Sequence, residues 1–285
     1  MIPGEFQYHR PASLEEAVAL LARYGDDARV MAGGHSLIPM MKLRMANPEH
    51  LVDLQALRGL RGITVTEREV RLGALTSQHE IIASTTLAEA CPILAATAKL
   101  IADPQVRYCG TLGGNVANGD PGNDMPAVMQ ALDATYHLEG PSGRRGVKAR
   151  GFYEAAYFTA LAEGEILTAV SFDRPAAGHL WAYEKLKRKV GDYATAAVAV
   201  LLVLDGDSCK AAAVALTNVA ATPLYAQAAA AALVGSRLDE TAVAAAVEAA
   251  KAITDPAADL RGPVDYRRHV TGVMLRRALI AAQSR

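Results

Sequence analysis

The sequence predicts a mixed α+β fold of two domains. A length of 285 residues suits two domains, and 51% apolar residues are enough to fill two hydrophobic cores. Short apolar runs of strand length alternate with segments whose apolar residues recur at helical spacing. The stretch 175–178, Pro-Ala-Ala-Gly, is typical of a linker. We therefore expect one domain at residues 1–176 and a second at residues 177–285.

The first domain is expected to begin with a helix at 11–24. Ser13 is a suitable N-cap, and Glu16 three residues later can complete a capping box. Gly25 ends this helix and leads into a short buried strand at 29–31.

The rest of the first domain follows from the same patterns, with one lobe at about 1–57 and another at about 58–176. We expect a helix at 37–43, a strand at 51–54, a connector at 58–62, a hairpin of 63–66 and 70–73, helices at 76–83, 86–101 and 124–132, a hairpin of 136–139 and 144–149, and a strand at 164–172.

The second domain changes in character toward alanine-rich helices. Alanine has high helix propensity and allows close packing, and the apolar periodicity persists. The ordinary interpretation of this domain is a scaffold or a partner surface. We expect strands at 181–186, 195–204 and 210–216, followed by helices at 223–234, 239–253 and 264–282.

The segment Gly110–Pro126, GTLGGNVANGDPGNDMP, is expected to be a loop because it is dense in glycine, proline, asparagine and aspartate. Gly113 and Gly114 allow a ligand to approach the main chain, and phosphate is the obvious one. The Thr111 hydroxyl and the Asn115 amide flank the pair and can add hydrogen bonds. The alternative is a tight structural loop.

A second glycine pair favours the binding interpretation. The segment Ala32–Pro39, AGGHSLIP, places Gly33 and Gly34 beside His35 and Ser36, directly after the strand at 29–31. Two such loops can hold a diphosphate from two sides, which suggests a dinucleotide. Neither segment has the spacing of a Rossmann turn or a P-loop, so another fold is required. For the His35 side chain, contact with the ligand and a hydrogen bond within the loop are equally compatible with its neighbours.

Charge and cysteine content exclude several classes. A net charge of −1 gives no indication of nucleic acid as a partner, and the first residues do not read as a signal peptide. No apolar run reaches membrane-spanning length, so we expect a cytoplasmic protein. Cys91, Cys109 and Cys209 are too few and too far apart for an iron–sulfur cluster in this chain alone. Cys109 is expected to be a small packed side chain.

The pairing of AGGHS at Ala32–Ser36 with TLGGN at Thr111–Asn115 resembles the FAD-binding medium subunits of the molybdenum hydroxylases, the xanthine oxidase family. The resemblance spans nearly the whole chain and is most evident with the carbon monoxide dehydrogenase type. Other segments that carry it are PEHLVDL, LIADPQVRYCGTLGGN, NGDPGNDMPA, YEKLKRKVGDYATA, LTNVA and GVMLRRA.

The resemblance implies a vanillyl-alcohol-oxidase-type FAD-binding fold, with two α+β lobes followed by a three-stranded sheet with helices. It implies FAD on this chain, the molybdenum cofactor on a large subunit and two [2Fe–2S] clusters on a small subunit, in a dimer of heterotrimers. Electrons would pass from the clusters to FAD and then to an acceptor such as quinone, with loose attachment to the inner membrane face left open. The assembled enzyme would oxidise CO to CO2.

The resemblance also assigns roles to three residues that have simpler interpretations. Asp124 would bind the FAD ribose, or else cap the helix at 124–132. Lys185 would approach the flavin and stabilise its reduced form, or else belong to a solvated strand edge. Tyr193 would lie against one face of the ring, or else be structural. The expected cofactor-binding set is Ala32, Gly33, Gly34, His35, Ser36, Thr111, Gly113, Gly114, Asn115, Asp124, Lys185 and Tyr193. We predict no catalytic acid or base and no metal ligand in this chain.

Three alternatives remain open. The same flavin subunit could serve an enzyme that oxidises an aldehyde, nicotine, a purine or another N-heterocycle. A stand-alone flavin oxidase of the same fold is more remote, because the chain is short and has no His or Cys motif for covalent FAD attachment. A nucleotide-binding regulatory module without redox chemistry is the third.

Overall fold

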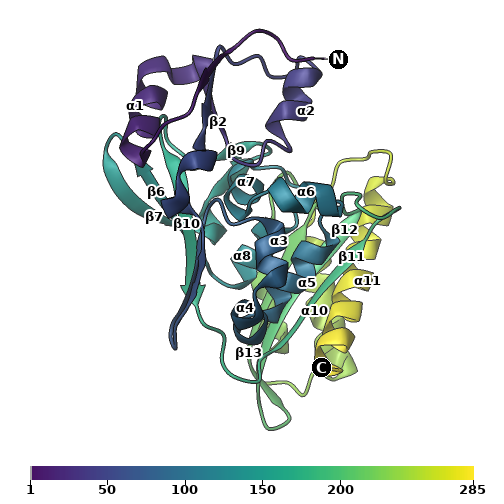
Figure 1. The fold of residues 1–285 in the computed structure, drawn as a ribbon. Coiled ribbons are helices and arrows are strands. Elements are labelled where there is room, and N and C mark those ends of the chain that lie inside the picture. The colour runs from purple at the N-terminus through teal and green to yellow at the C-terminus, as the bar shows by residue number, and fades with distance from the viewer. Residues whose placement is uncertain (1) are drawn as a thin grey trace.

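The computed structural model describes residues 2–285 and contains three main β-sheets, a two-stranded ribbon and flanking helices (Figure 1). The strands are β1 Gln7–His9, β2 Ala28–Met31, β3 His50–Asp53, β4 Ile63–Val65, β5 Glu69–Gly73, β6 Thr135–Gly140, β7 Gly143–Lys148, β8 Tyr153–Ala155, β9 Phe158–Thr159, β10 Ile166–Asp173, β11 Leu180–Leu186, β12 Ala196–Asp205, β13 Ser208–Thr217 and β14 Leu224–Tyr225. The α-helices are α1 Leu14–Tyr24, α2 Leu37–Lys42, α3 Gln78–Ala83, α4 Thr85–Ala90, α5 Pro92–Leu100, α6 Pro104–Cys109, α7 Leu112–Ala117, α8 Met125–Ala131, α9 Gln227–Leu233, α10 Glu240–Ala252 and α11 Val264–Gln283.

The first lobe is a small parallel sheet in the order β1-β3-β2, with α1 packed against it. Ser13 caps α1 as predicted, because its Oγ accepts a hydrogen bond from the Glu16 N–H at 3.1 Å. The Glu16 carboxylate reaches back to the N–H of Ala12 at 2.7 Å, one residue before the cap. Ala17 and Leu21 then face the core of this lobe. β1 was not predicted, since three residues give no usable period.

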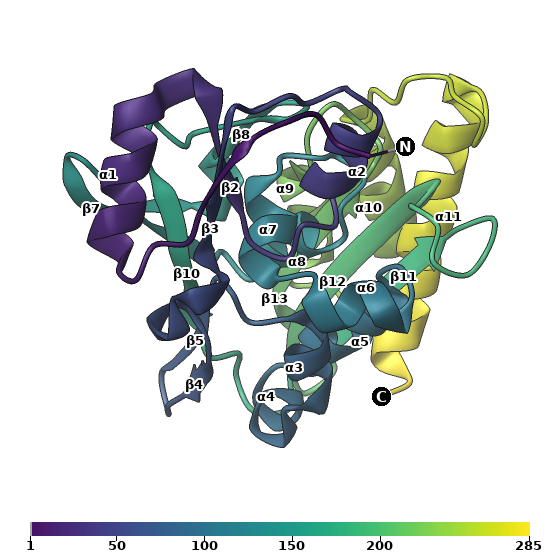
Figure 2. The ribbon, with the colours of Figure 1, turned by 45° about the horizontal axis from the view of Figure 1, so that its top comes forward.

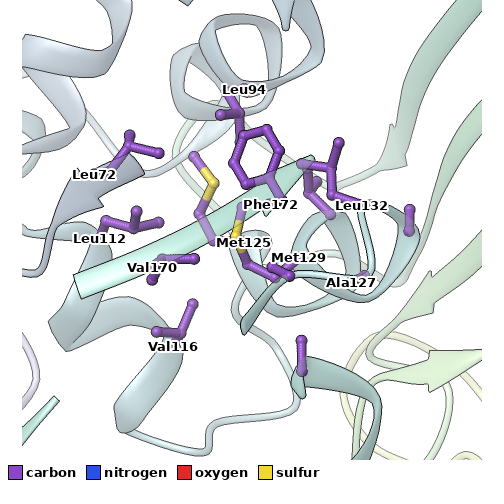
Figure 3. Packing of buried hydrophobic residues seen from close by; sticks show 14 of the residues in the cluster. Leu72, Leu94, Leu112, Val116, Met125, Ala127, Met129, Leu132, Val170 and Phe172 are labelled. Carbon is purple, nitrogen blue, oxygen red and sulfur yellow. The ribbon is translucent and has the colours of Figure 1, made fainter. Parts of the chain in front are cut away.

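The second lobe is an antiparallel sheet in the order β4-β5-β10-β6-β7. Alternate residues of β5, β6 and β10 enter one large core together with α3, α4, α5, α7 and α8. Figure 3 shows the centre of this core, where Met125 and Met129 of α8 meet Leu94 and strand β10. Both predicted hairpins are present in this sheet.

The C-terminal sheet has the order β11-β12-β13-β14, so the three predicted strands are joined by a two-residue fourth. The helices α9, α10 and α11 cover one face, and α5 and α8 contact the other. In Figure 2, α7 and α8 lie between the first lobe and the strands β12 and β13. Because both faces are covered, β12 is apolar at consecutive positions instead of alternating.

The structure corrects the prediction that Gly110–Pro126 is all loop. Residues Leu112–Ala117 form α7, and Thr111 is its N-cap, with its Oγ1 accepting from the Gly114 N–H at 3.0 Å. Gly113 lies inside this helix because a Cβ there would come within 2.7 Å of the Ala74 carbonyl oxygen. Glycine therefore permits close packing of a helix at this point, and the irregular backbone starts only at Asn118.

One further expectation about helices was wrong. The segment 86–101 is two helices, because Pro92 starts α5 and has no N–H to continue the preceding α4. Helix α6 was not predicted. It begins at Pro104, and the Asp103 carboxylate caps it by accepting from the Val106 N–H at 3.0 Å.

Candidate functional site

All twelve residues predicted from sequence to bind a cofactor line one cavity of about 670 Å³. The cavity takes residues from the two lobes and from the C-terminal sheet. Ligand sites of this kind typically measure about 300–1,000 Å³. The cavity is therefore large enough for an extended ligand such as a dinucleotide.

The loop at residues 32–36 presents unpaired backbone donors to this cavity. Among residues 2–285, no hydrogen-bond acceptor is found for the N–H groups of residues 33–36. Gly34 has a φ of +72°, a conformation that glycine adopts without strain. Gln55 fixes the loop from behind by donating to the Ala32 carbonyl at 3.1 Å. A row of free N–H groups around a left-handed residue is an anion-binding arrangement.

The two glycine pairs are neighbours. A Cβ on Gly33 would lie 2.2 Å from the carbonyl oxygen of Cys109, so the loop at 32–36 packs directly on the backbone that enters α7. A Cβ on Gly114 would have only the Thr111 Oγ1 at 3.0 Å and the Ala32 Cβ at 3.8 Å within 4 Å. Gly33 is thus needed for contact between loops, whereas Gly114 keeps a surface between them clear.

The N–H groups of the second pair are not free, which corrects part of the prediction. Gly113 donates to the Ala74 carbonyl at 2.8 Å, and Gly114 donates to Thr111 Oγ1. The Asn115 carboxamide oxygen accepts from the Met125 N–H at 3.2 Å. Donors for an anion therefore come from the first loop, and the second offers an open surface.

The side chains of His35 and Ser36 are exposed within this lining. Neither makes a hydrogen bond with residues 2–285, so the loop-stabilising alternative for His35 has no support. Cys109 is also exposed, which corrects its expected role as a packed side chain, whereas Cys91 and Cys209 are buried.

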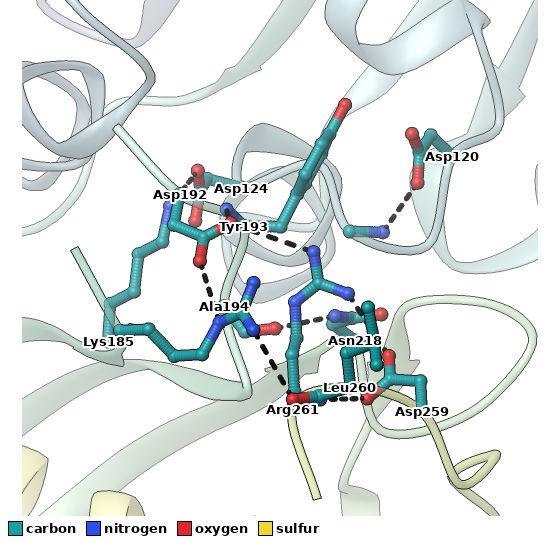
Figure 4. Close-up of polar contacts among 12 residues, drawn as sticks. Asp120, Asp124, Lys185, Asp192, Tyr193, Ala194, Asn218, Asp259, Leu260 and Arg261 are labelled. Carbon is teal, nitrogen blue, oxygen red and sulfur yellow. Dashed lines mark hydrogen bonds and ion pairs between the residues drawn. The ribbon is translucent and has the colours of Figure 1, made fainter. Parts of the chain in front are cut away.

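Asp124 and Lys185 form a buried ion pair at the cavity wall (Figure 4). The Lys185 ammonium lies 2.8 Å from Asp124 Oδ2, and the two side chains are 2% and 5% exposed. Tyr183 donates from its hydroxyl to Asp124 Oδ1 at 2.6 Å. Asp124 makes no helix-capping hydrogen bond, and Lys185 is not on a solvated edge, so both simpler interpretations are wrong.

Burial is the main influence on the Asp124 carboxyl. Removal from water raises its pKa, and the neighbouring charge of Lys185 and the hydroxyl of Tyr183 oppose that rise. The pair places a cation and its carboxylate partner together in the cavity wall.

Tyr193 extends toward the cavity from the loop between β11 and β12, and its side chain remains accessible, with 44% of the residue exposed. Tyr157 lines the same cavity from the turn between β8 and β9, with a φ of +65°. Partial burial raises the pKa of both phenols, and the carboxylate of Asp120 raises it further. Sequence reasoning missed Tyr157, because nothing in its local sequence marks it as a cavity residue. It also missed the buried Tyr183, which binds Asp124.

Two other parts of the chain complete the lining. Gly25 packs against the Glu163 side chain, and the segment 163–167 joins it at the wall. Gly191 packs against the backbone of Ala102 beside Lys185 and Tyr193. Sequence reasoning missed the 163–167 segment, which has no motif of its own.

Within residues 2–285 there is no group of three or more His, Cys, Asp or Glu side chains that could hold a metal ion. Nor does any helix in this range combine the length and apolarity needed to cross a bilayer.

Two family models together match almost the whole chain. The FAD binding domain in molybdopterin dehydrogenase matches residues 4–175, and the CO dehydrogenase flavoprotein C-terminal domain matches residues 181–282. The carbon monoxide dehydrogenase medium chain of Afipia carboxidovorans is 58% identical over 285 residues, which is 100% of this chain and 99% of the relative. The medium chain of the same name from Hydrogenophaga pseudoflava is 50% identical with the same coverage.

A solved structure gives the same result. A chain of the reconstituted CO dehydrogenase from Oligotropha carboxidovorans superposes with a TM-score of 0.99 and 58% identity, with 100% of both chains covered. The predicted fold is therefore confirmed. The chain belongs to the FAD-binding medium subunits of the molybdenum hydroxylases.

Proposed function

We propose that the cavity holds FAD and that the chain is an electron-transfer subunit of a heterotrimeric molybdenum hydroxylase. The observation that carries this proposal is the convergence of all twelve predicted residues on one cavity within a chain of this family. Bound FAD supplies redox chemistry that links one-electron and two-electron carriers. The chain itself binds and orients the cofactor.

The residues present fit this cofactor. The free N–H groups of residues 33–36 suit a diphosphate, and the clear surface above Gly114 allows it to approach. Lys185 and Tyr193 lie together at the part of the wall formed by the C-terminal sheet, which suits the isoalloxazine ring. The segment 163–167 and Gly25 would then face the adenosine end. Because Asp124 pairs with Lys185, it would meet the ribityl chain next to the ring, and not the predicted ribose, through lone pairs that Lys185 and Tyr183 leave free.

Each protein group has a separate task in this arrangement. The loop at 32–36 binds the diphosphate by charge–dipole attraction. Lys185 places a positive charge near the ring, which favours its reduced form, while Asp124 fixes the position of the ammonium. Tyr193 covers one face of the ring and limits what reaches it. No residue of this chain is required to take a proton from the substrate.

The partner subunits and the substrate are part of the proposal. Electrons would reach FAD from two [2Fe–2S] clusters on a small subunit, after oxidation of the substrate at a molybdenum cofactor on a large subunit, in a dimer of heterotrimers. We assign CO oxidation to CO2 to the assembled enzyme because the relatives named carbon monoxide dehydrogenase medium chain are 58% and 50% identical over the full length. The acceptor would be quinone, with the complex on the cytoplasmic side of the membrane. The domain boundary near residue 176 belongs to the same proposal.

The test is purification of the chain from its native host with its bound partners. A visible spectrum that combines flavin and iron–sulfur absorption, with two co-purifying polypeptides, is the expected result. The intact complex is then assayed with CO and, in parallel, with aldehydes and N-heterocycles. An intact, metal-loaded complex without CO oxidation would refute the substrate assignment alone. A lone chain that binds no added FAD would refute the cofactor assignment.

A further inference from the structure

The loop that carries Tyr193 is held by charged residues far away in the sequence. It runs from residue 187 to residue 195, between β11 and β12, and faces the irregular segment 254–263 that precedes α11. The Arg188 guanidinium donates to the Leu260 carbonyl at 3.3 Å, although 72 residues separate them. These two segments therefore meet beside residues 191–193, which line the cavity (Figure 4).

Asp192 and Arg261 connect the two segments beside the tyrosine ring. Asp192 Oδ1 accepts from the Tyr193 N–H at 2.9 Å and lies 3.7 Å from Arg261 Nη2. Asp192 Oδ2 accepts from Arg188 at 3.2 Å. The Arg261 guanidinium carbon lies 5.8 Å from the centroid of the Tyr193 ring, within the range of a cation–π contact. One guanidinium thus contacts both the ring and the carboxylate that binds the backbone N–H of the same residue.

Arg261 is itself fixed from behind. Its guanidinium donates to Asp259 at 3.1 Å, and its side chain is only 22% exposed. Asp259 also pairs with Arg267, whose buried guanidinium donates to the carbonyls of Thr195, Ala257 and Asn218. The anchor therefore extends from α11 through Asp259 to Arg261, and the tyrosine loop rests on it.

We infer that Arg261, acting with Asp192, is a positioning residue that holds the Tyr193 ring against the cavity. Tyr193 is 44% exposed, and its ring packs on Gly122, where a Cβ would lie 2.6 Å from the ring carbon Cδ1. Gly122 supports the ring at that point, and Arg261 and Asp192 add the charged contacts. Gly191 lies against Ala102 on one side, and the charged anchor supplies the restraint on the other. These contacts determine the position of the Tyr193 ring. The effect of that position on a bound flavin rests on the proposed function. With FAD bound, Arg261 determines how far the exposed face of the flavin is covered.

The test uses the full chain with 3-fluorotyrosine incorporated at position 193 and observes its 19F NMR signal without cofactor. We expect Arg261→Ala to shift and narrow this signal, because the population of displaced rings should rise roughly 2- to 10-fold. Arg261→Lys keeps the charge and should restore much of the native signal. Arg276→Ala is the matched control, since it removes an ion pair between Arg276 of α11 and Glu240 of α10. An unchanged 19F signal in folded Arg261→Ala would overturn the inference.

Asp192→Asn provides a second, milder variant in case Arg261→Ala does not fold. It keeps an acceptor for the Tyr193 N–H and removes the charge that faces Arg261, so it should move the signal in the same direction. An Asp192→Asn signal identical to wild type would also count against the inference.

A second measurement uses the FAD-loaded chain. The fluorescence lifetime of bound FAD should be longer in Arg261→Ala than in wild type. Adding Arg261→Ala to a Tyr193→Ala variant should leave the lifetime unchanged. An equal lengthening in the Tyr193→Ala background would show that Arg261 acts by another route. If wild-type chain binds no FAD, the proposed function fails and the 19F comparison alone decides the role of Arg261.

Discussion

Replacement of Lys185 by methionine should strongly destabilise the protein in a pH-dependent manner. Lys185 Nζ lies 2.8 Å from Asp124 Oδ2, and both side chains are at most 5% exposed. Loss of one member of a buried pair leaves an uncompensated charge and costs about 3–5 kcal/mol. Burial already raises the Asp124 pKa, and removal of the ammonium should raise it further.

The sign of the pH dependence follows from this shift. In the Lys185→Met variant, the folded-state pKa of Asp124 lies well above the unfolded value of about 3.9, so the folded state binds the proton more tightly. Stability should therefore increase as the pH falls through the folded-state pKa. The loss relative to wild type should be largest near about pH 8 and clearly smaller near about pH 5.

The assay is urea unfolding of wild type and variant at both pH values. Lys189→Met is the control, because Lys189 is an exposed lysine in the loop that follows β11. The double replacement Lys185→Met with Asp124→Leu should recover most of the stability, since an apolar pair of similar volume is often neutral. A loss below about 1 kcal/mol, or an equal loss at both pH values, would refute the description of a desolvated ion pair.

Three other substitutions separate folding from cofactor binding. Gly33→Ala should lower the free energy of unfolding, measured by urea titration, by about 2 kcal/mol or more, because the new Cβ would lie 2.2 Å from a backbone carbonyl oxygen. Gly59→Ala is the control and should be near neutral, because a Cβ there would have nothing within 4 Å. Gly114→Ala should leave the free energy of unfolding within about 1 kcal/mol of wild type but weaken FAD binding by about tenfold or more, as measured by fluorescence titration. An unchanged affinity for FAD would argue against the proposed position of the diphosphate. Tyr193→Phe should retain FAD with an unchanged flavin-to-protein absorbance ratio, since stacking requires the ring alone, and complete loss of flavin would contradict that role.

The elements that sequence predicted well are those with strong local signals. The cap at Ser13, the hairpin at Gly140–Gly143 and the apolar run of β12 each follow from residues within a few positions of one another. The glycine-rich segment shows the limit of composition. Gly113 lies in a helix at a point where Ala74 leaves no room for a Cβ, and this contact comes from a segment about 40 residues earlier in the chain.

Sequence predicted which residues line the candidate site better than it predicted the contacts between them. Family motifs identified residues that share one cavity, but the partner of Lys185 was not foreseen, because Asp124 lies 61 positions away. Arg261 has no motif and reaches Tyr193 only through the fold. Contacts of this kind depend on how two domains pack, and no periodicity in the sequence encodes them.

The strand order of the second lobe has a consequence for synthesis on the ribosome. β10 lies between β5 and β6 in the sheet, yet it is the last of the five strands in the chain. Synthesis of the 92 residues between β5 and β10 takes roughly 5–20 s at about 5–20 residues per second, and β5 cannot pair with β10 before then. During that time first the β4-β5 pair and later also the β6-β7 pair expose unpaired edges, and such edges are prone to pair with other chains. Nascent chains of this protein should therefore need chaperone protection until residue 173 has emerged.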